Sequence, residues 1–344
     1  MKRTPGLALA FGLALMHCGS EPQSPTSSPT GGWPSAPSAS TTVASNTTAT
    51  FALDSLDFAD ESATSWGRVG FDLDDHVTDL STYHEVCNRD PKASNQLPID
   101  ASHDGIVGVD NSFGAHVVPM LHGLAGKPTI TPLVTDSIRR GEFSLQLRIQ
   151  GLDGSRHQSS VGLVADALPS PAFGNGGQAP TFAPPETWPV RADLVADGTS
   201  LNSRYRFEHA YVNDGTFVSG RGELVLGATF LGAPIDLHLR GAIVVGTIEG
   251  DTMKGTIAGA LDIEEFIVAS RSVATHASAT YCGEQFDKLA PIFRQTKDIL
   301  LDGTNRAGVP CEATSFAVGF TAKRIANPVA TASVTPIDAL AKCK

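Results

Sequence analysis

The middle of the chain alternates between apolar and polar residues with a period of two, the pattern of half-buried β-strands. The clearest run is FSLQLRIQGL at 143–152, whose odd-numbered apolar residues share one face. The stretches 205–226 and 228–261 continue the alternation, and Asn213–Gly215 is a strong hairpin-turn signal within the first. Successive strands joined by short turns must pair antiparallel. The pattern predicts a mainly β fold, an antiparallel meander that forms a sandwich or a partly closed barrel.

Segments with helical spacing flank these strands. SFGAHVVPMLHGLAG and TPLVTDSIRRG predict a helical segment over about 112–141, followed by a β body over about 142–322. A helix is expected after Asp262, and another over 283–303 that Pro291 should kink or start. The run 314–325 reads as a last strand that closes the sheet. The helices are therefore few and peripheral, and residues 51–344 are expected to form one β-rich domain.

The N-terminal residues have the layout of a secretory signal. Lys2 and Arg3 precede an apolar run that is too short to span a bilayer, and LMHC resembles a lipobox ending at Cys18. We therefore predict a signal peptide over 1–18 with lipidation at Cys18, and a disordered Ser/Thr/Pro tether over 19–50. This predicts an exported lipoprotein of the cell envelope, anchored to the outer membrane on its periplasmic or cell-surface face. The alternative is an ordinary cleaved signal with a chance cysteine.

With Cys18 lipidated, an even number of cysteines remains in an exported chain, which favours two disulfides. These residues are Cys87, Cys282, Cys311 and Cys343. They allow three pairings, and we expect Cys282–Cys311 to close a local loop, leaving Cys87 to join Cys343. A zinc site is disfavoured because the chain contains no CxxC pair.

Removal of residues 1–17 leaves 23 basic and 36 acidic residues, a net charge of −13. Such acidity excludes nucleic acid as an expected partner and disfavours electrostatic adhesion to anionic membranes. The predicted partners are the membrane, through the lipid anchor, and an unidentified protein or glycan.

The stretch IDASHDGIVGVDN at 99–111 has calcium-loop spacing in its first half. Asp100, Ser102, Asp104 and Gly105 match the start of the D-x-[DN]-x-[DN]-G pattern, whose alternating oxygens converge on a cation. The carbonyl of Ile106 and the side chains of Asp110 and Asn111 complete the candidate Ca²⁺ ligands. Position 12 is Asn111 and not a bidentate Glu. The alternative is that Asp110 or Asn111 caps the helix that begins near Ser112.

A second acidic group is FDLDD, in which Asp72 and Asp74 are expected on one strand face. Plain solvent exposure, a buried pair or a cation would each explain the two neighbouring carboxylates. An acidic cleft formed with Asp100 and Asp104 is the basis of an alternative function, a hydrolase acting on envelope or extracellular polymers.

A long Pro/Gly-rich loop at 168–190 carries three aromatic residues, Phe173, Phe182 and Trp188. Long loops in compact domains are often functional, and exposed aromatics there would bind a ligand by stacking. The alternative is that they fold back over one open end of the sheet. Elsewhere the sequence lacks GxSxG, HExxH and P-loop motifs, so no catalytic residue is predicted and a binding or structural role is favoured over an enzyme.

Several of these stretches together resemble a group of bacterial lipoproteins of the myxobacterial kind. The resemblance rests on Cys18 with its tether, WGRVGFDLD at 66–74, Cys87, DGIVGVDNSFG at 104–114 and CEATSFAVGFTA at 311–322. The motif D-G-x-x-G-[IV]-D-N-S-F-G is its most specific part. No activity is established for those proteins, so the resemblance implies export and anchoring and transfers no catalytic residue.

Overall fold

The fold was analysed in a computed structural model of the chain. The structure describes residues 32–37, 45–78, 81–88, 90–92, 108–126, 129–173, 179–196, 201–230, 233–282 and 284–334. All of them belong to one compact unit, residues 31–344.

An antiparallel sheet dominates this unit, with eleven strands in the described part of the chain. The strands in chain order are β1(Thr48–Asp57), β2(Ser144–Gln150), β3(His157–Gln158), β4(Val164–Ser170), β6(Tyr205–Phe207), β7(Tyr211–Asn213), β8(Thr216–Val218), β9(Gly222–Phe230), β10(Ala233–Glu249), β11(Thr252–Asp262) and β12(Ala313–Ile325). A separate parallel pair joins β5(Val190–Arg191) to β13(Thr331–Ala332).

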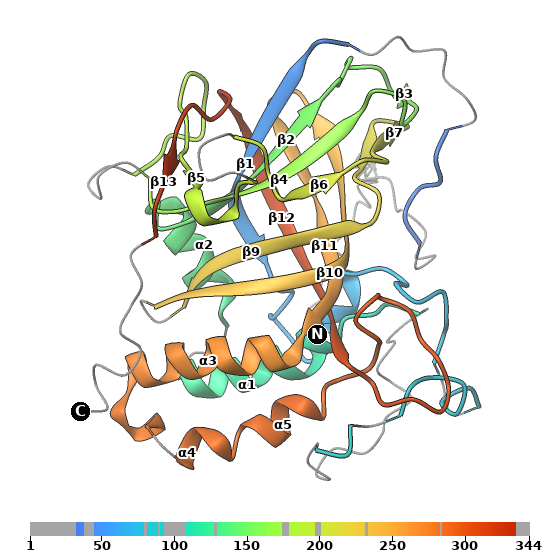
Figure 1. Ribbon diagram of the computed structural model, residues 1–344, viewed down its shortest axis with the longest axis vertical. Coiled ribbons are helices and arrows are strands. Elements are labelled where there is room, and N and C mark those ends of the chain that lie inside the picture. Colours follow the sequence, from blue (N-terminus) through green and yellow to red (C-terminus); the bar gives the residue numbers. More distant parts are fainter. Residues whose placement is uncertain are drawn as a thin grey trace, which may run out of the picture. The chain divides into compact units, whose positions relative to one another are not determined.

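The sheet curls into a half-barrel, so the predicted antiparallel, mainly β class is confirmed in its partly closed form (Figure 1). The strand order is β3-β7-β8-β10-β11-β12-β1-β2-β4-β6, with β9 also paired to β10. Strand β12 was expected to close the sheet, but it lies in the middle, between β11 and β1. It therefore joins the N-terminal strands to the C-terminal ones.

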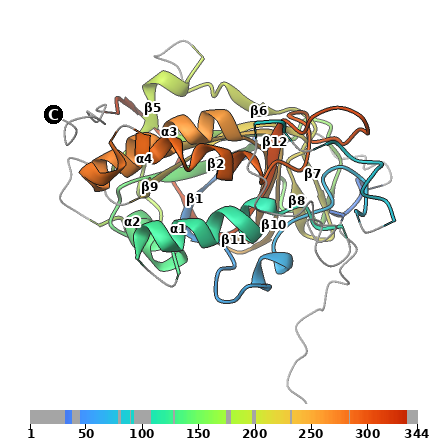
Figure 2. The same cartoon turned by 90° about the horizontal axis from the view of Figure 1, so that it is seen from below.

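Several of the helices lie at one end of the sheet (Figure 1). Their bounds are η1(Ser65–Arg68), the π-helical η2(Phe113–Val117), α1(Val118–Ala125), α2(Thr131–Arg139), η3(Ala192–Leu194), α3(Ile263–Ala277), η4(Ala279–Tyr281), α4(Glu284–Asp287) and α5(Ala290–Arg294). Helix α3 packs against β10, α2 against β1, and η2 against β12. Viewed from below, α1 and α3 cross the view as separate, roughly parallel rods (Figure 2). In the described residues, none of the helices has the length and apolarity needed to span a bilayer.

Local sequence signals account for several of these elements. Asp214 and Gly215 both have positive φ angles, 50° and 78°, as a two-residue hairpin turn between β7 and β8 requires. The Asp262 carboxylate accepts hydrogen bonds from the backbone N–H groups of Glu264 and Glu265, which caps α3 at its start. The helix expected over 283–303 is broken into the short α4 and α5, with Pro291 in the first turn of α5. Local chain signals thus set where the sheet turns and where its helices begin.

The main core fills the space between the sheet and the helices. Phe113 of η2 belongs to this core, with ring centroids 4.9 Å from Phe316 on β12 and 5.6 Å from Phe266 on α3. Each of these rings is at most 2% exposed. Burial of the three rings by elements far apart in sequence is a large part of what fixes the helices on the sheet.

Part of the predicted tether lies against the domain. The Trp33 ring packs edge-on against Phe71, at 5.8 Å between centroids, and Arg221 lies over its face. Tyr211 donates a hydrogen bond to the Pro34 carbonyl, and β1 already begins at Thr48. The folded part therefore starts before residue 51. The Ser/Thr/Pro-rich composition around Trp33 gave no indication that this ring packs on the domain.

Candidate functional site

An apolar cavity of about 60 Å³ lies between the end of the sheet and the helices. Strands β9 and β10 and helices α1, α2 and α3 contribute most of its lining. Figures 1 and 2 show how these elements are arranged. The lining side chains are Phe58, Phe113, Leu121, Ile130, Val134, Ala228, Phe230, Ile235, Leu237, Phe266, Ser270, Val273, Ala274 and Tyr281. None of them is charged.

Alternation along β9 and β10 produces this wall. Ala228 and Phe230 on β9 and Ile235 and Leu237 on β10 face the cavity, as residues two apart in a strand must share a face. The intervening residues line a different hollow, of about 470 Å³, which includes Asp236. The hairpin therefore has one apolar face toward the helices and a more polar face away from them.

Helix α3 contributes the opposite wall through residues at helical spacing. Phe266, Ser270, Val273 and Ala274 recur at intervals of three and four and line the cavity together. Ser270 therefore holds a position in the stripe that would otherwise be apolar. Sequence reasoning did not identify it as a site residue, although a single serine in the apolar stripe of an amphipathic helix is a visible signal.

The Ser270 hydroxyl is the unusual group in this cavity. The residue is 7% exposed, and within the described part of the chain its Oγ has no hydrogen-bond partner. A serine inside a helix usually bonds to a carbonyl one turn earlier or to water. Leaving a buried hydroxyl unpaired costs about 1–3 kcal/mol. In the described part of the chain, the lining thus combines apolar side chains with one serine whose buried hydroxyl lacks a partner.

The cavity has a mouth where its lining is only half-buried. Leu121 on α1, Ile235 at the start of β10 and Tyr281 in η4 are each partly exposed, whereas Phe113, Ile130 and Phe266 are fully enclosed. Helix α1, strand β10 and η4 therefore contribute partly exposed residues to the lining. A cavity of about 60 Å³ has room for only a few water molecules, so a longer ligand has to move side chains at the mouth.

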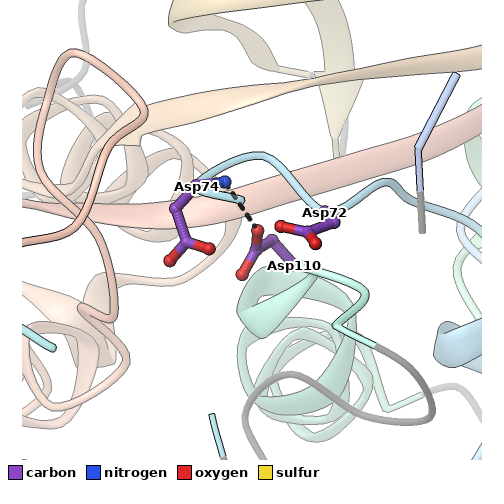
Figure 3. Close-up of side chains that lie close together, drawn as sticks. All are labelled: Asp72, Asp74 and Asp110. Atoms are coloured by element: carbon purple, nitrogen blue, oxygen red, sulfur yellow. Dashed lines mark hydrogen bonds between the residues drawn. The ribbon is translucent and has the colours of Figure 1, made fainter. Parts of the chain in front are cut away.

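A second candidate feature is a cluster of three carboxylates, Asp72, Asp74 and Asp110 (Figure 3). One oxygen from each lies within 4.8 Å of the others. Asp110 is fully buried, and its Oδ2 accepts hydrogen bonds from the N–H groups of Leu73, at 2.6 Å, and Asp74, at 3.3 Å. Asp110 therefore holds the 72–74 loop in place.

The other two carboxylates also bond to nearby groups. The N–H of His76 donates to Asp72, at 3.1 Å, and to Asp74, at 2.9 Å, and the Asn305 amide donates to Asp74 at 2.8 Å. Burial raises the pKa of Asp72, and the charge of Asp74 raises it further. Burial also raises the pKa of Asp74, against the hydrogen bond from Asn305, which lowers it. The surroundings of Asp72 and Asp74 thus favour the neutral, protonated form of each carboxyl group.

The structure describes only two of the predicted calcium ligands, Asp110 and Asn111. Asp100, Ser102, Asp104 and Ile106 lie outside the described residues, so calcium binding by their loop stays a prediction. Residues 72–74 form no regular strand face; they lie in a bend next to a bridge between Phe71 and Asp110. Asn111 caps the helix, as expected, because its Oδ1 accepts a hydrogen bond from the N–H of Gly114.

The three aromatic residues of the long loop pack together. The Trp188 ring lies 4.9 Å from Phe173 and 5.6 Å from Phe182, and Trp188 is fully buried beside Ala52 on the sheet. This is the folded-back arrangement. A hollow of about 370 Å³ borders Phe173 and Trp188, and ligand binding by the loop stays a prediction.

The expected disulfide pairing is wrong for Cys311. Cys87 is bonded to Cys311 across 224 residues of sequence, and not to Cys343. Cys282 is disulfide-bonded as well, while Cys18 and Cys343 lie outside the described residues. The local pairing fails because Asn88 and the segment 309–311 are already hydrogen-bonded side by side, which places Cys87 next to Cys311.

No protein-family model, curated protein or solved structure significantly matches the chain. The resemblance to bacterial lipoproteins therefore stays a prediction that rests on the quoted motifs. The candidate site must be interpreted from its own geometry.

Proposed function

We propose that the protein is an exported, lipid-anchored binding protein that holds a small apolar molecule in the cavity beneath β9 and β10. One observation carries the proposal: among the described residues, the cavity lining has no charged side chain, includes partly exposed side chains, and contains a serine whose buried hydroxyl has no partner. Binding sites for small molecules are concave and mostly apolar, with a few placed polar groups. The signal-like N-terminus and Cys18 support the export and the anchor.

A packing defect is the competing explanation for such a cavity. An empty cavity of about 60 Å³ destabilises a fold by about 1.4 kcal/mol when each Å³ costs about 24 cal/mol. A defect and a binding site differ in what happens when an apolar compound is added. A ligand that binds the folded state alone raises the melting temperature with its concentration.

The experiment is a thermal-shift titration of the mature chain with short linear alkanes and alkan-1-ols of three to eight carbons. We expect the melting temperature to rise for several members of the series. Ala274→Leu, which fills the cavity from α3, should abolish the rise. Ala269→Leu makes the same change on the same helix outside the cavity lining and should retain it. An unchanged melting temperature of the wild-type protein across the whole series contradicts the proposal.

The proposed anchor has a separate test. Mass spectrometry of the mature protein from a bacterial host that processes lipoproteins should show Cys18 as an acylated first residue. An unmodified Cys18, or cleavage elsewhere, contradicts the anchor and leaves the binding proposal in place.

Calcium binding is a second proposal, independent of the cavity. It is supported by the convergence of oxygens from Asp72, Asp74 and Asp110 within 4.8 Å and by the calcium-like spacing of residues 100–105. Oxygen ligands of this kind are those that Ca²⁺ prefers. A higher melting temperature in calcium than in chelator supports it, provided that Asp74→Asn reduces the difference. Identical melting temperatures at saturating calcium contradict it.

A further inference from the structure

We infer that the bound molecule is an uncharged amphiphile, a linear hydrocarbon chain with a neutral hydroxyl or carbonyl group that hydrogen-bonds to Ser270. This inference rests on the proposed binding function and specifies its ligand class. It excludes alkanes as the best ligands, because they have no polar group, and it excludes carboxylates and phosphates, because they are charged.

The ligand is expected to carry a polar group because the buried Ser270 hydroxyl has no hydrogen-bond partner among the described residues. Its Oγ is buried and lacks a partner among the described residues, although Ser270 lies in the middle of α3. A hydroxyl can both donate and accept, so a ligand hydroxyl or carbonyl group satisfies it. A site with a buried polar group discriminates against an analogue that lacks the matching group, because the protein group then stays unpaired.

The absence of charge on the ligand follows from the rest of the lining. Among the described residues that line the cavity, none carries a cationic side chain. Transfer of a carboxylate into such surroundings without a partner is strongly unfavourable. Arg271, the neighbour of Ser270 on α3, is already paired with Asp287 and stacked over Phe286. A charged head group would therefore lose its hydration without compensation.

The shape of the site favours a single linear chain. The enclosed volume is about 60 Å³, well below the roughly 150 Å³ of an engineered apolar cavity that binds benzene. A linear chain can extend past Leu121, Ile235 and Tyr281 at the mouth by moving side chains alone. A ring system requires a wider opening between helix and strand.

The test compares three six-carbon compounds: hexane, hexan-1-ol and hexanoate at neutral pH. Dissociation constants are measured by calorimetry for the wild-type chain and for Ser270→Ala. We expect Ser270→Ala to weaken hexan-1-ol by about fivefold more than it weakens hexane, as for one buried hydrogen bond. This comparison forms a double-mutant cycle, which isolates the contact between the two hydroxyl groups. Hexanoate should bind the wild-type chain more weakly than hexan-1-ol.

Control variants separate this effect from a structural role of Ser270. Ser272→Ala changes a serine on the same helix outside the cavity lining and should bind hexan-1-ol like the wild type. Ser270→Thr keeps a hydroxyl and should retain part of the preference. The free energy of unfolding of Ser270→Ala without ligand should be equal to or above that of the wild type, because a hydroxyl without a partner is removed.

Failure of the inference is distinguishable from failure of the proposed function. Equal effects of Ser270→Ala on hexane and hexan-1-ol overturn the role of Ser270, although the cavity still binds. Tighter binding of hexanoate than of hexan-1-ol overturns the neutral head group. Failure of all three compounds to bind overturns the proposed function itself, and the inference with it.

Discussion

At the scale of single residues, Asn111 connects three segments of the chain. Its Oδ1 accepts hydrogen bonds from the N–H groups of Gly114 and Ala317, and its Nδ2 donates to the carbonyls of Trp66 and Val69. The residue is fully buried. One amide thus fixes the start of a helix, the β12 strand and the segment that leads to the carboxylate cluster.

Replacement of Asn111 should therefore be severe. Asn111→Ala leaves several buried backbone groups without partners, and each costs about 1–3 kcal/mol. We expect the free energy of unfolding to fall by about 3 kcal/mol or more in urea titrations. Asn327→Ala is the control, at an exposed asparagine that accepts one hydrogen bond, from the Thr50 hydroxyl, and it should cost clearly less, about 1 kcal/mol. A similar, small loss for both variants would refute the connecting role of Asn111.

Asp72 gives a prediction about pH. Its pKa in the folded state is raised above the ordinary value by burial and by Asp74. Because the pKa is raised, protonated Asp72 contributes favourably to the free energy of unfolding. This contribution is complete below the unfolded pKa of about 4 and is lost as pH rises through the folded pKa. Asp72→Asn keeps an oxygen that can accept from His76 and removes the charge.

The melting temperature of Asp72→Asn should therefore exceed that of the wild type at pH 7 by about 1 °C, a small gain because solvent screens this partly exposed group. The difference should vanish near pH 3, where both side chains are neutral. Calorimetric scans from pH 3 to pH 8 without calcium measure it. A variant that is less stable than the wild type at pH 7 under these conditions contradicts the prediction.

The calcium pattern illustrates what residue spacing can and cannot predict. The spacing of Asp110 and Asn111 correctly indicated a helix start, because capping depends on a few adjacent residues. It did not indicate that Asp110 meets Asp72 and Asp74, since those residues come from a loop 36 to 38 positions earlier. Contacts of this kind depend on the fold of the whole domain.

At the scale of elements, the local patterns were reliable where one face of an element is buried. The alternation in 143–152 predicted β2, and Leu145, Leu147 and Ile149 are all buried. Asn213–Gly215 predicted the β7–β8 hairpin for the same local reason. Strand pairing was harder to predict from the sequence. Strand β1 pairs with β12 from the other end of the chain, and no local pattern specifies such a partner.

Strand β9 gives an element-scale prediction about stability. Ala228 lines the cavity, and Ala228→Val adds apolar atoms with a side chain suited to strands. Partial filling should recover up to about 1 kcal/mol of the cavity's cost, raising the free energy of unfolding of the protein without ligand. The same variant should bind hexan-1-ol more weakly, because it occupies the ligand's space.

The control for this variant is Thr229→Val, the next residue along β9, whose side chain lies outside the lining of this cavity. It tests whether any valine at this part of the strand stabilises the protein. We expect a change below about 0.5 kcal/mol in urea unfolding and no change in hexan-1-ol affinity. Destabilisation by Ala228→Val would show that the cavity wall cannot accept the added methyl groups.

At the scale of the whole molecule, strand β12 and the Cys87–Cys311 disulfide both link early segments of the chain to late ones. Cys311 comes just before β12 in the sequence. β12 starts at Ala313 and pairs with both β11 and β1. The disulfide ends at Cys311, two residues earlier, and closes a segment of 224 residues. Composition alone favoured disulfides in an exported chain, but their pairing depends on which loops the sheet brings together.

The pairing predicts a large effect on stability. A covalent link across 224 residues restricts the unfolded chain strongly, and native disulfides of this kind contribute about 2–5 kcal/mol. The double variant Cys87→Ala/Cys311→Ala should therefore lose about that much free energy of unfolding in urea, with the loss absent when both proteins are compared under reducing conditions. Peptide mapping without reduction should recover one fragment that joins the two cysteines. A fragment that joins Cys282 to Cys311 would instead restore the local pairing and contradict the arrangement in which Asn88 pairs beside Pro310.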